Sequence, residues 1–354
     1  MTGLRGIRRF RGRTILFGCV TFLCVAVSVW YSRRLLYLTW LLATLPLRWE
    51  KDEQASYSGR PSFFVDPAAD GLDLTFQSYN TNQLDTGDGY INRVPPILHH
   101  VVLGENAMND IPQDWKDARQ SCLDLHPGWE VYLWTDEKAR VLVDEKFPDL
   151  KSTWDQYPYR IQRVDALRYM ALYEYGGIVL DMDLECKRSL GPLRRFEFLA
   201  PSAHPTGFSI SFMMASRGNE FISAILQSLK MYNRRWLATP YVTVMFSTGG
   251  HFASTIHTLQ QNRSQYKVLT GTEDNPTLHT LNGKASTPLV NHLGSSSWHT
   301  YDAAIIVLLG HVFGWTVPFL LFGLAGFWLL LFHRLFQIHR ISKWKNKESI
   351  YRVA

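Results

Sequence analysis

Cysteine is scarce in this sequence, with four residues among 354. Small secreted scaffolds held by disulfides use far more cysteine, and many structural zinc sites use C-x-x-C pairs, which this chain lacks. Charged residues make up 19% of the chain and hydrophobic residues 46%, whereas a disordered chain has the opposite balance. The sequence therefore excludes a disulfide scaffold, a C-x-x-C zinc site and an unfolded chain.

Long apolar runs are absent from the middle of the chain, which excludes a polytopic transporter. Two uncharged runs lie near the ends, at 14–30 and 303–332. Each adjoins a basic tail: residues 1–13 hold five arginines and no acid, and residues 333–354 hold six lysines and arginines and one acid. Because the two tails each carry +5, more than the chain's net charge of +6 in total, the rest of the chain is net negative (6 − 10 = −4), and we expect no nucleic acid as a partner.

The two apolar runs predict membrane segments. Residues 14–30 have the character of a transmembrane signal anchor rather than a cleaved signal peptide, because the run is long and no small-x-small cleavage site follows it. Residues 303–332 are predicted to form either one helix kinked at Pro318 or a tight re-entrant hairpin. Basic flanks stay in the cytosol, so we expect both termini there and the residues between the segments in the lumen of the secretory pathway.

Residues 31–93 are predicted to hold an interfacial segment and a lumenal stalk. Leu35–Leu47 is too short to span a bilayer, and it either lies among the lipid headgroups or continues a tilted first span. Polar, irregular sequence follows it. A lumenal position also makes Asn262 a candidate glycosylation site, since Asn262-Arg263-Ser264 fits the acceptor triplet.

Residues 94–299 are predicted to form one α/β domain with a mostly parallel sheet, because strand-like and helix-like segments alternate along them. The expected strands lie within 94–104 and at 130–134, 178–180, 198–200 and 210–215. The expected helices lie at 115–126, from 138 onward, at 163–175 and at 219–232.

The most informative stretch is 163–185, in which a helix ends at a glycine pair and a short strand stops at Asp181. Ligands in α/β proteins bind at the carboxyl ends of strands. Alternate residues of an extended segment point the same way, so Asp181 and Asp183 are predicted to face one site, where two carboxylates suit a hard divalent cation. On the preceding helix, Asp165 and Arg168 share a face. They either serve sugar hydroxyls and phosphate oxygens or simply pair with each other.

The complete string resembles the signature of the DXD-containing sugar transferases of glycosyltransferase family 32, D-x-x-R-Y followed by L-x-x-x-G-G-x-x-x-D-x-D. Its positions here are Asp165, Arg168, Tyr169, Leu172, Gly176, Gly177, Asp181 and Asp183. Four further segments resemble motifs of the same family, with Gly250 in place of a proline: VPPILHHVVLG (94–104), HPGWEVYLWTD (126–136), STGG (247–250) and HLGSSSWH (292–299). The resemblance covers 94–299 and implies a GT-A-type nucleotide-sugar transferase domain.

The resemblance also implies a metal site. Asp183 would be the direct ligand of a Mn²⁺ or Mg²⁺ that bridges the two phosphates of a nucleotide sugar. Asp181 would hold ribose or sugar hydroxyls and reach the metal. His292 is the candidate third ligand, since an imidazole supplies the nitrogen that carboxylates lack.

Five residues are expected to bind the donor besides Asp181. The resemblance implies that Asp165 hydrogen-bonds the transferred hexose and that Arg168, next to Tyr169, steadies the sugar or diphosphate oxygens. Ser297 and Trp298 would belong to a loop that closes over the diphosphate. His99 and His100, at the first strand, are expected to be packing residues.

Three features are most similar to the fungal mannosyl-inositolphosphoceramide synthase catalytic subunits: the histidine pair 99–100, the WEVYLWTD run (129–136) and the apolar run after the S-W-H segment. This similarity implies a retaining transfer of mannose from GDP-mannose to inositol phosphoceramide at a Golgi or other secretory membrane. A membrane regulatory subunit is a further candidate partner. The alternatives are a Golgi α-mannosyltransferase or galactosyltransferase that acts on protein-linked glycans, an inactive regulatory homologue and a peripheral membrane-binding protein.

Overall fold

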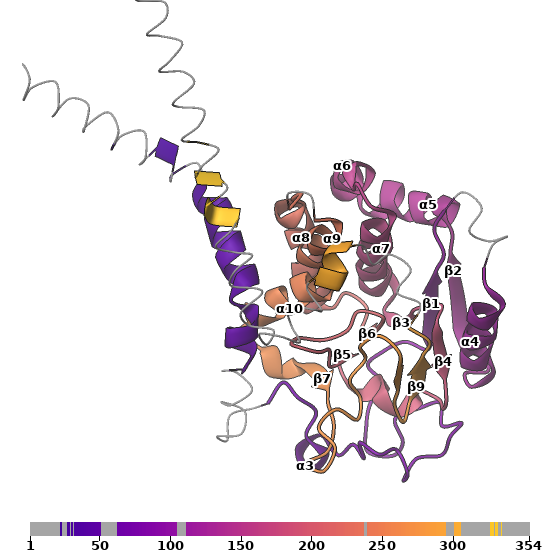
Figure 1. Cartoon of the computed structure of the whole chain (residues 1–354). Helices are drawn as coiled ribbons and strands as arrows, with labels where there is room; N and C mark the ends of the chain where they lie inside the picture. The colour runs from indigo at the N-terminus through magenta and orange to yellow at the C-terminus, as the bar shows by residue number, and fades with distance from the viewer. Residues whose placement is uncertain are drawn as a thin grey trace, which may run out of the picture. The chain divides into compact units, whose positions relative to one another are not determined.

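The structure is a computed structural model of the chain, and Figure 1 shows the arrangement of its elements. It describes residues 22, 27–28, 30, 32–50, 62–104, 111–236, 239–294, 301–305, 326–328, 330–331 and 334. The chain divides into two compact units, one of Thr44–Pro318 and one of Met1–Ala43 with Phe319–Ala354.

The centre of the Thr44–Pro318 unit is a six-stranded sheet in the order β2-β1-β3-β6-β5-β7 (Figure 1). Its strands are β1 (Ile97–Val101), β2 (Glu130–Trp134), β3 (Gly177–Leu180), β5 (Phe198–Pro201), β6 (Phe212–Ala215) and β7 (Tyr266–Leu269). β1 runs parallel to β2 and β3, and β5 runs parallel to β7, whereas β6 is antiparallel to both of its neighbours. The predicted α/β class with a mostly parallel sheet is confirmed, and β6 is the one reversed strand among those described.

A second, smaller sheet holds three short antiparallel strands in the order β4-β9-β8. They are β4 (Leu184–Cys186), β8 (Ala285–Ser286) and β9 (Val290–His292). The sequence analysis did not predict this sheet. It matters for function because β4 begins directly after the D-x-D motif.

Helices flank the large sheet, and the predicted helices at 115–126, 163–175 and 219–232 are confirmed with ends shifted by a few residues. The helices are α3 (Pro67–Asp70), α4 (Gln113–Asp124), α5 (Asp136–Lys146), α6 (Pro148–Gln156), α7 (Arg160–Tyr175), α8 (Glu220–Tyr232), α9 (Pro240–Ser247) and α10 (Gly250–Thr258), with 3₁₀ turns η1 (Gly191–Arg195) and η2 (Arg263–Gln265). Asn219 precedes α8 as its cap, because its side-chain oxygen accepts from the amides of Phe221 and Ile222.

The glycine pair 176–177 turns α7 into β3. Both residues have positive φ angles, 69° and 100°, which side chains with a Cβ rarely adopt. A Cβ on Gly177 would also lie 2.7 Å from the carbonyl oxygen of Ile97 in the neighbouring strand. The pair therefore lets the start of β3 lie close to β1, and β3 then ends just before Asp181.

The sequence analysis predicted that the domain starts at Val94. In the structure, residues N-terminal to Val94 also pack into the compact unit. Phe63, Val65 and Phe76 are buried. The Val65 amide donates to the Val268 carbonyl in β7 at 3.1 Å, and the Val268 amide donates to the Phe63 carbonyl at 2.8 Å. Residues 62–93 thus pack on the domain, which agrees with the expectation of a partly packed stalk. Isolated apolar residues in a polar, irregular segment gave no periodic signal for this packing.

Residues 32–50 are helical with a turn at 44, and Trp49 packs against the rings of Phe63 and His257. Within the described residues, no helix has both the length and the apolar character needed to cross a bilayer. Most of the two predicted membrane segments, 14–30 and 303–332, lies outside those residues.

One disulfide joins the helical layer to the small sheet. Cys122 of α4 and Cys186 of β4 form it, across a sequence separation of 64 residues. The Cys186 amide also donates to the Ser121 hydroxyl at 2.9 Å. A single disulfide among the described residues agrees with the exclusion of a disulfide scaffold, but the sequence analysis did not predict this pair. β4 is therefore tied covalently to α4 at the strand that follows the D-x-D motif.

Candidate active site

The D-x-D motif forms a turn between β3 and β4. The Asp181 amide donates to the Ser211 carbonyl at 2.8 Å, and the Leu184 amide donates back to the Asp181 carbonyl at 3.1 Å. Met182 is buried, at 5% exposed. The prediction that the two carboxylates face one site holds, but the reason differs, because a tight turn rather than an extended segment brings them together.

His292, which follows Asp183 by 109 residues (292 − 183), joins the two carboxylates. β9 pairs with β4 so that His292 lies opposite Leu184, and the Leu293 amide donates to the Asp183 carbonyl at 3.0 Å. One ligand atom each from Asp181, Asp183 and His292 then lies within 4.8 Å of the others. The structure therefore brings together the three residues that the sequence indicated as metal ligands.

The donor set of this cluster fits a divalent cation. Nδ1 of His292 is hydrogen-bonded to the Gly283 carbonyl, so in the neutral ring Nδ1 carries the proton and the lone pair of Nε2 is free for a metal. Nε2 lies 3.5 Å from Oδ1 of Asp183. Two carboxylate oxygens and an imidazole nitrogen suit Mn²⁺ and related ions.

The charges around His292 also favour a cation. Burial lowers the pKa of His292, but the hydrogen bond with Asp183 and the negative charges of Asp183 and Asp181 outweigh it and raise the pKa. The same negative charge that favours an imidazolium favours a metal ion, which would replace the proton.

Arg168 links the preceding helix to the motif. Its Nη1 donates to Oδ1 of Asp165 at 3.1 Å, and its Nη2 donates to Oδ1 of Asp181. Asp165 and Arg168 do pair with each other, as one interpretation of the sequence expected, and the pair extends to Asp181. Arg168 thus orients two carboxylates, while its contact with donor oxygens stays a prediction.

One guanidinium does not balance the carboxylates around it. Burial raises the pKa of Asp165 to about 6, although the charge of Arg168 and the hydrogen bond from Thr248 oppose the rise. Burial likewise raises the pKa of Asp181 to about 6 against the opposing charge of Arg168. Both buried carboxylates therefore depend on the positive charge of Arg168, and a bound cation would add to that charge.

A layer of hydrogen bonds behind the site fixes Asp165. The Thr248 hydroxyl donates to Oδ2 of Asp165 at 2.9 Å, and the hydroxyl of Tyr169 donates to the Thr248 carbonyl at 2.6 Å. Gln162 donates to the Ser247 hydroxyl at 2.6 Å. The STGG segment therefore positions Asp165. The family resemblance identified this segment but not its role.

Tyr169 is fully buried, and its hydroxyl supports Thr248 through the hydrogen bond described above. Its binding to the donor stays a prediction. Ser297 and Trp298 lie outside the described residues. His99 and His100 are buried in β1, where Nε2 of His99 is bonded to the Gly176 carbonyl at 2.8 Å, and the prediction that they pack inside the domain is confirmed.

Known proteins similar to this chain share the motif region. The family described as the glycosyltransferase sugar-binding region containing a DXD motif matches residues 112–199. Inositol phosphoceramide mannosyltransferase 3 of Schizosaccharomyces pombe is 32% identical over 271 residues, which cover 73% of this chain and 72% of that protein.

Two proteins of Saccharomyces cerevisiae are similar over a smaller share of their length. Mannosyl phosphorylinositol ceramide synthase CSH1 is 35% identical over 65% of this chain and 60% of its own length. Mannosyl phosphorylinositol ceramide synthase SUR1 is 34% identical over 71% of this chain and 65% of its own length. Among solved structures, the PaToxG glycosyltransferase has a TM-score of 0.38 and 14% identity over 46% of this chain and 68% of its own.

Proposed function

We propose a function on the premise that this chain belongs to the DXD-containing glycosyltransferase family of the fungal inositol phosphoceramide mannosyltransferases. The chain is a hexosyltransferase, and its reaction is the transfer of mannose from GDP-mannose to an inositol hydroxyl of inositol phosphoceramide. The bond between the anomeric carbon and the diphosphate breaks, a bond to the inositol oxygen forms, and the hydroxyl proton leaves with the diphosphate. The single observation that carries the proposal is the convergence of Asp181, Asp183 and His292.

These three residues would hold Mn²⁺ or Mg²⁺. A bound ion would neutralise the negative charge that develops on the departing diphosphate. The chain contributes geometry: β4 and β9 fix His292 opposite the motif, and the hydrogen bond to Gly283 fixes the ring tautomer. Such preorganisation is what makes electrostatic stabilisation effective in a transition state.

Asp165 and Arg168 serve the donor sugar in this proposal. Asp165 is held by Thr248 on one side and Arg168 on the other, so its orientation toward a hexose hydroxyl is set before the donor binds. Asp165 and Asp181 both bind Arg168, which makes either a poor nucleophile. We infer a same-face substitution that retains the anomeric configuration, in which the departing phosphate takes the acceptor proton.

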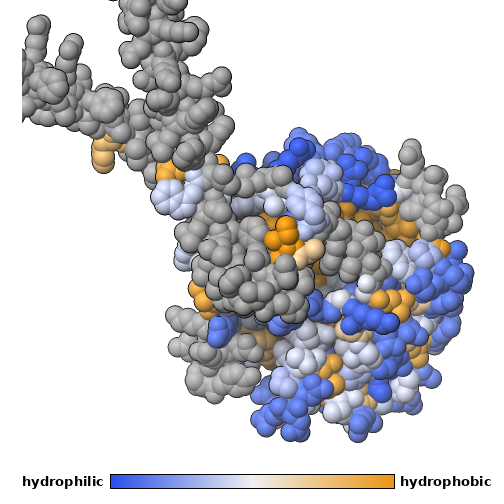
Figure 2. All heavy atoms as spheres, viewed as in Figure 1, coloured by the Kyte–Doolittle hydropathy of each residue, from blue (hydrophilic) through white to orange (hydrophobic). Residues whose placement is uncertain are grey.

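The domain is proposed to lie in the lumen of a Golgi or other secretory membrane, with segments 14–30 and 303–332 in the bilayer and both tails in the cytosol. The disulfide supports an oxidising compartment. Asn262 is exposed at η2, as a glycosylation site requires. Most of the coloured residues on the domain face shown in Figure 2 are hydrophilic. Tyr37 and Trp40, in the helical residues before the turn at 44, are more than half exposed, at 54% and 55%, as aromatic residues at a membrane interface are.

The test uses microsomes that contain the full chain, GDP-mannose and inositol phosphoceramide. We expect a mannosylated lipid that is lost with EDTA and restored by Mn²⁺. Matched reactions replace GDP-mannose with UDP-galactose, or the lipid with a high-mannose oligosaccharide. Transfer only to the oligosaccharide would contradict the lipid acceptor, and full transfer in EDTA would contradict the metal.

A further inference from the structure

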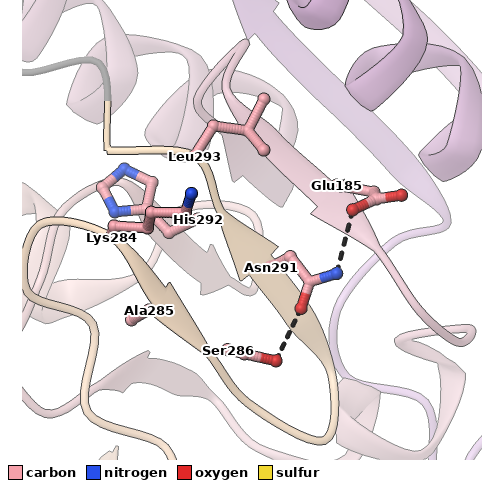
Figure 3. Close-up of a pocket in the computed structure, with 7 residues that line it drawn as sticks. All are labelled: Glu185, Lys284, Ala285, Ser286, Asn291, His292 and Leu293. Atoms are coloured by element: carbon pink, nitrogen blue, oxygen red, sulfur yellow. Dashed lines mark hydrogen bonds between the residues drawn. The ribbon is translucent and has the colours of Figure 1, made fainter.

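The small sheet carries a pocket beside the metal cluster. Its volume is about 260 Å³, and it is lined by residues of β4, β8 and β9 and the turns next to them. Figure 3 shows its polar side chains, of which five matter here: Glu185, Lys284, Ser286, Asn291 and His292. The volume lies just below the range of drug-sized ligand sites, which leaves room for about one ring.

The pocket is lined by none of the residues that serve the donor in the proposed function. Asp165, Arg168 and Asp181 lie on the side of α7 and β3, whereas the pocket belongs to the small sheet. The one shared residue is His292, which lines the pocket and lies in the metal cluster. The pocket therefore adjoins the metal cluster through this residue.

Three side chains form a row across the three strands. The Ser286 hydroxyl donates to Oδ1 of Asn291 at 2.7 Å, and Nδ2 of Asn291 donates to Oε2 of Glu185 at 2.9 Å. Both bonds are drawn in Figure 3. They fix the amide orientation and leave the second oxygen of Glu185 and the second N–H of Asn291 for a ligand. Neighbouring acceptors and donors of this kind suit the adjacent hydroxyls of a polyol.

Lys284 adds a positive charge at the His292 side of the pocket (Figure 3). It is exposed, and no described residue forms an ion pair with its ammonium group. Its backbone is fixed, since Ala285 lies opposite His292 in the small sheet and Gly283 accepts from the His292 ring. The backbone of Gly294 also lies against it, because a Cβ on Gly294 would come within 2.6 Å of the Lys284 amide nitrogen.

We propose that this pocket binds the acceptor headgroup, a cyclic polyol phosphate, with the phosphate at Lys284 and the ring hydroxyls along Glu185, Asn291 and Ser286. The negative charge of Glu185 keeps the phosphate at the Lys284 end, so the two charges orient the ligand. The inference rests on the proposed function, because it identifies where that acceptor binds.

The first experiment measures binding of myo-inositol 1-phosphate to the purified full chain in detergent, with GDP and Mn²⁺ present. Lys284→Ala should weaken binding about tenfold or more, the effect of losing one charge-assisted hydrogen bond. Asn291→Ala should weaken it as well, and Lys284→Arg should retain most of it. Lys230→Ala removes an exposed lysine of α8 and should change nothing. Inorganic phosphate and myo-inositol should each bind much more weakly, and equal binding of inorganic phosphate would overturn the polyol assignment.

The second experiment compares the two KM values in membranes. Lys284→Ala should raise KM for inositol phosphoceramide about tenfold while KM for GDP-mannose changes less than twofold. A rise in KM for GDP-mannose alone would place the donor in the pocket, and two unchanged KM values would remove the pocket from the reaction. If the wild-type chain transfers no mannose to the lipid, the proposed function fails, while inositol phosphate binding still reports on the pocket.

Discussion

Replacing Arg168 by methionine tests the charge arrangement of the site. The substitution keeps an unbranched side chain and removes the guanidinium from between Asp165 and Asp181. Asp165 is 2% exposed, and removal of one partner from a buried ion pair costs about 3–5 kcal/mol of folding free energy. We therefore expect Arg168→Met to lower the free energy of unfolding by about that amount at pH 7.

The same substitution should weaken metal binding. With Arg168 present, burial already raises the pKa values of Asp165 and Asp181 to about 6. Without its positive charge, both values rise further, so Asp181 carries a proton more often at pH 7 and competes less well for Mn²⁺. The assays are urea unfolding of the full chain in detergent and a Mn²⁺ titration followed by electron paramagnetic resonance.

Two control variants separate this account from a loss of packing. Arg168→Met combined with Asp165→Asn should recover much of the stability, because an amide needs no countercharge and can still accept from Thr248. Arg140→Met breaks an exposed pair with Asp155, with side chains 46% and 42% exposed, and should cost about 0–1 kcal/mol. Strict additivity in the double variant, or unchanged Mn²⁺ affinity in Arg168→Met, would refute the reasoning.

Three further predictions concern the proposed metal ligands and the disulfide. Asp183→Ala should abolish transfer and Mn²⁺ binding without lowering the melting temperature, and retained transfer with bound Mn²⁺ would contradict its role as ligand. Cys122→Ser should lower the free energy of unfolding by about 4 kcal/mol, since the disulfide closes a loop of 64 residues; dithiothreitol should lower the melting temperature of the wild type and leave that of the variant unchanged. Mn²⁺ affinity should fall as the pH falls through about 6, because the pKa of Asp181 is raised to about 6 and its protonated form persists up to that pH. An affinity that stays constant down to pH 4.5 would mean that the pKa of Asp181 is not raised.

The arrangement of Asp165, Arg168 and Asp181 was predictable because these residues are close in sequence. Asp165 and Arg168 share one face of α7, and the glycine pair 176–177 and a four-residue strand separate them from Asp181. Local rules of helix periodicity and strand ends were sufficient for this part. They failed in one detail, since the D-x-D segment is a turn, in which hydrogen bonds between neighbouring residues replace the alternation of an extended strand.

The acceptor side was not predictable by local rules. β8 and β9 have two and three residues, too few for a strand pattern to be recognised. His292 was indicated by family resemblance alone, because its approach to Asp183 depends on pairing between β4 and β9. The partnership of Cys122 and Cys186 is likewise a matter of tertiary structure, since spacing in sequence does not determine which cysteines meet.

The three residues of β4 connect these separate features. Leu184 pairs with His292 of the metal cluster, Glu185 pairs with Asn291 of the pocket, and Cys186 is bonded to α4. A three-residue strand cannot hold its position by backbone hydrogen bonds alone, because isolated short strands are only marginally stable. The disulfide fixes one end of β4 and the turn at Asp183 fixes the other. The proposed metal ligand and the proposed acceptor pocket therefore share one rigid support, so a disturbance of β4 should affect both, whereas Asp165 and Arg168, the proposed donor residues, lie on α7, a separate element.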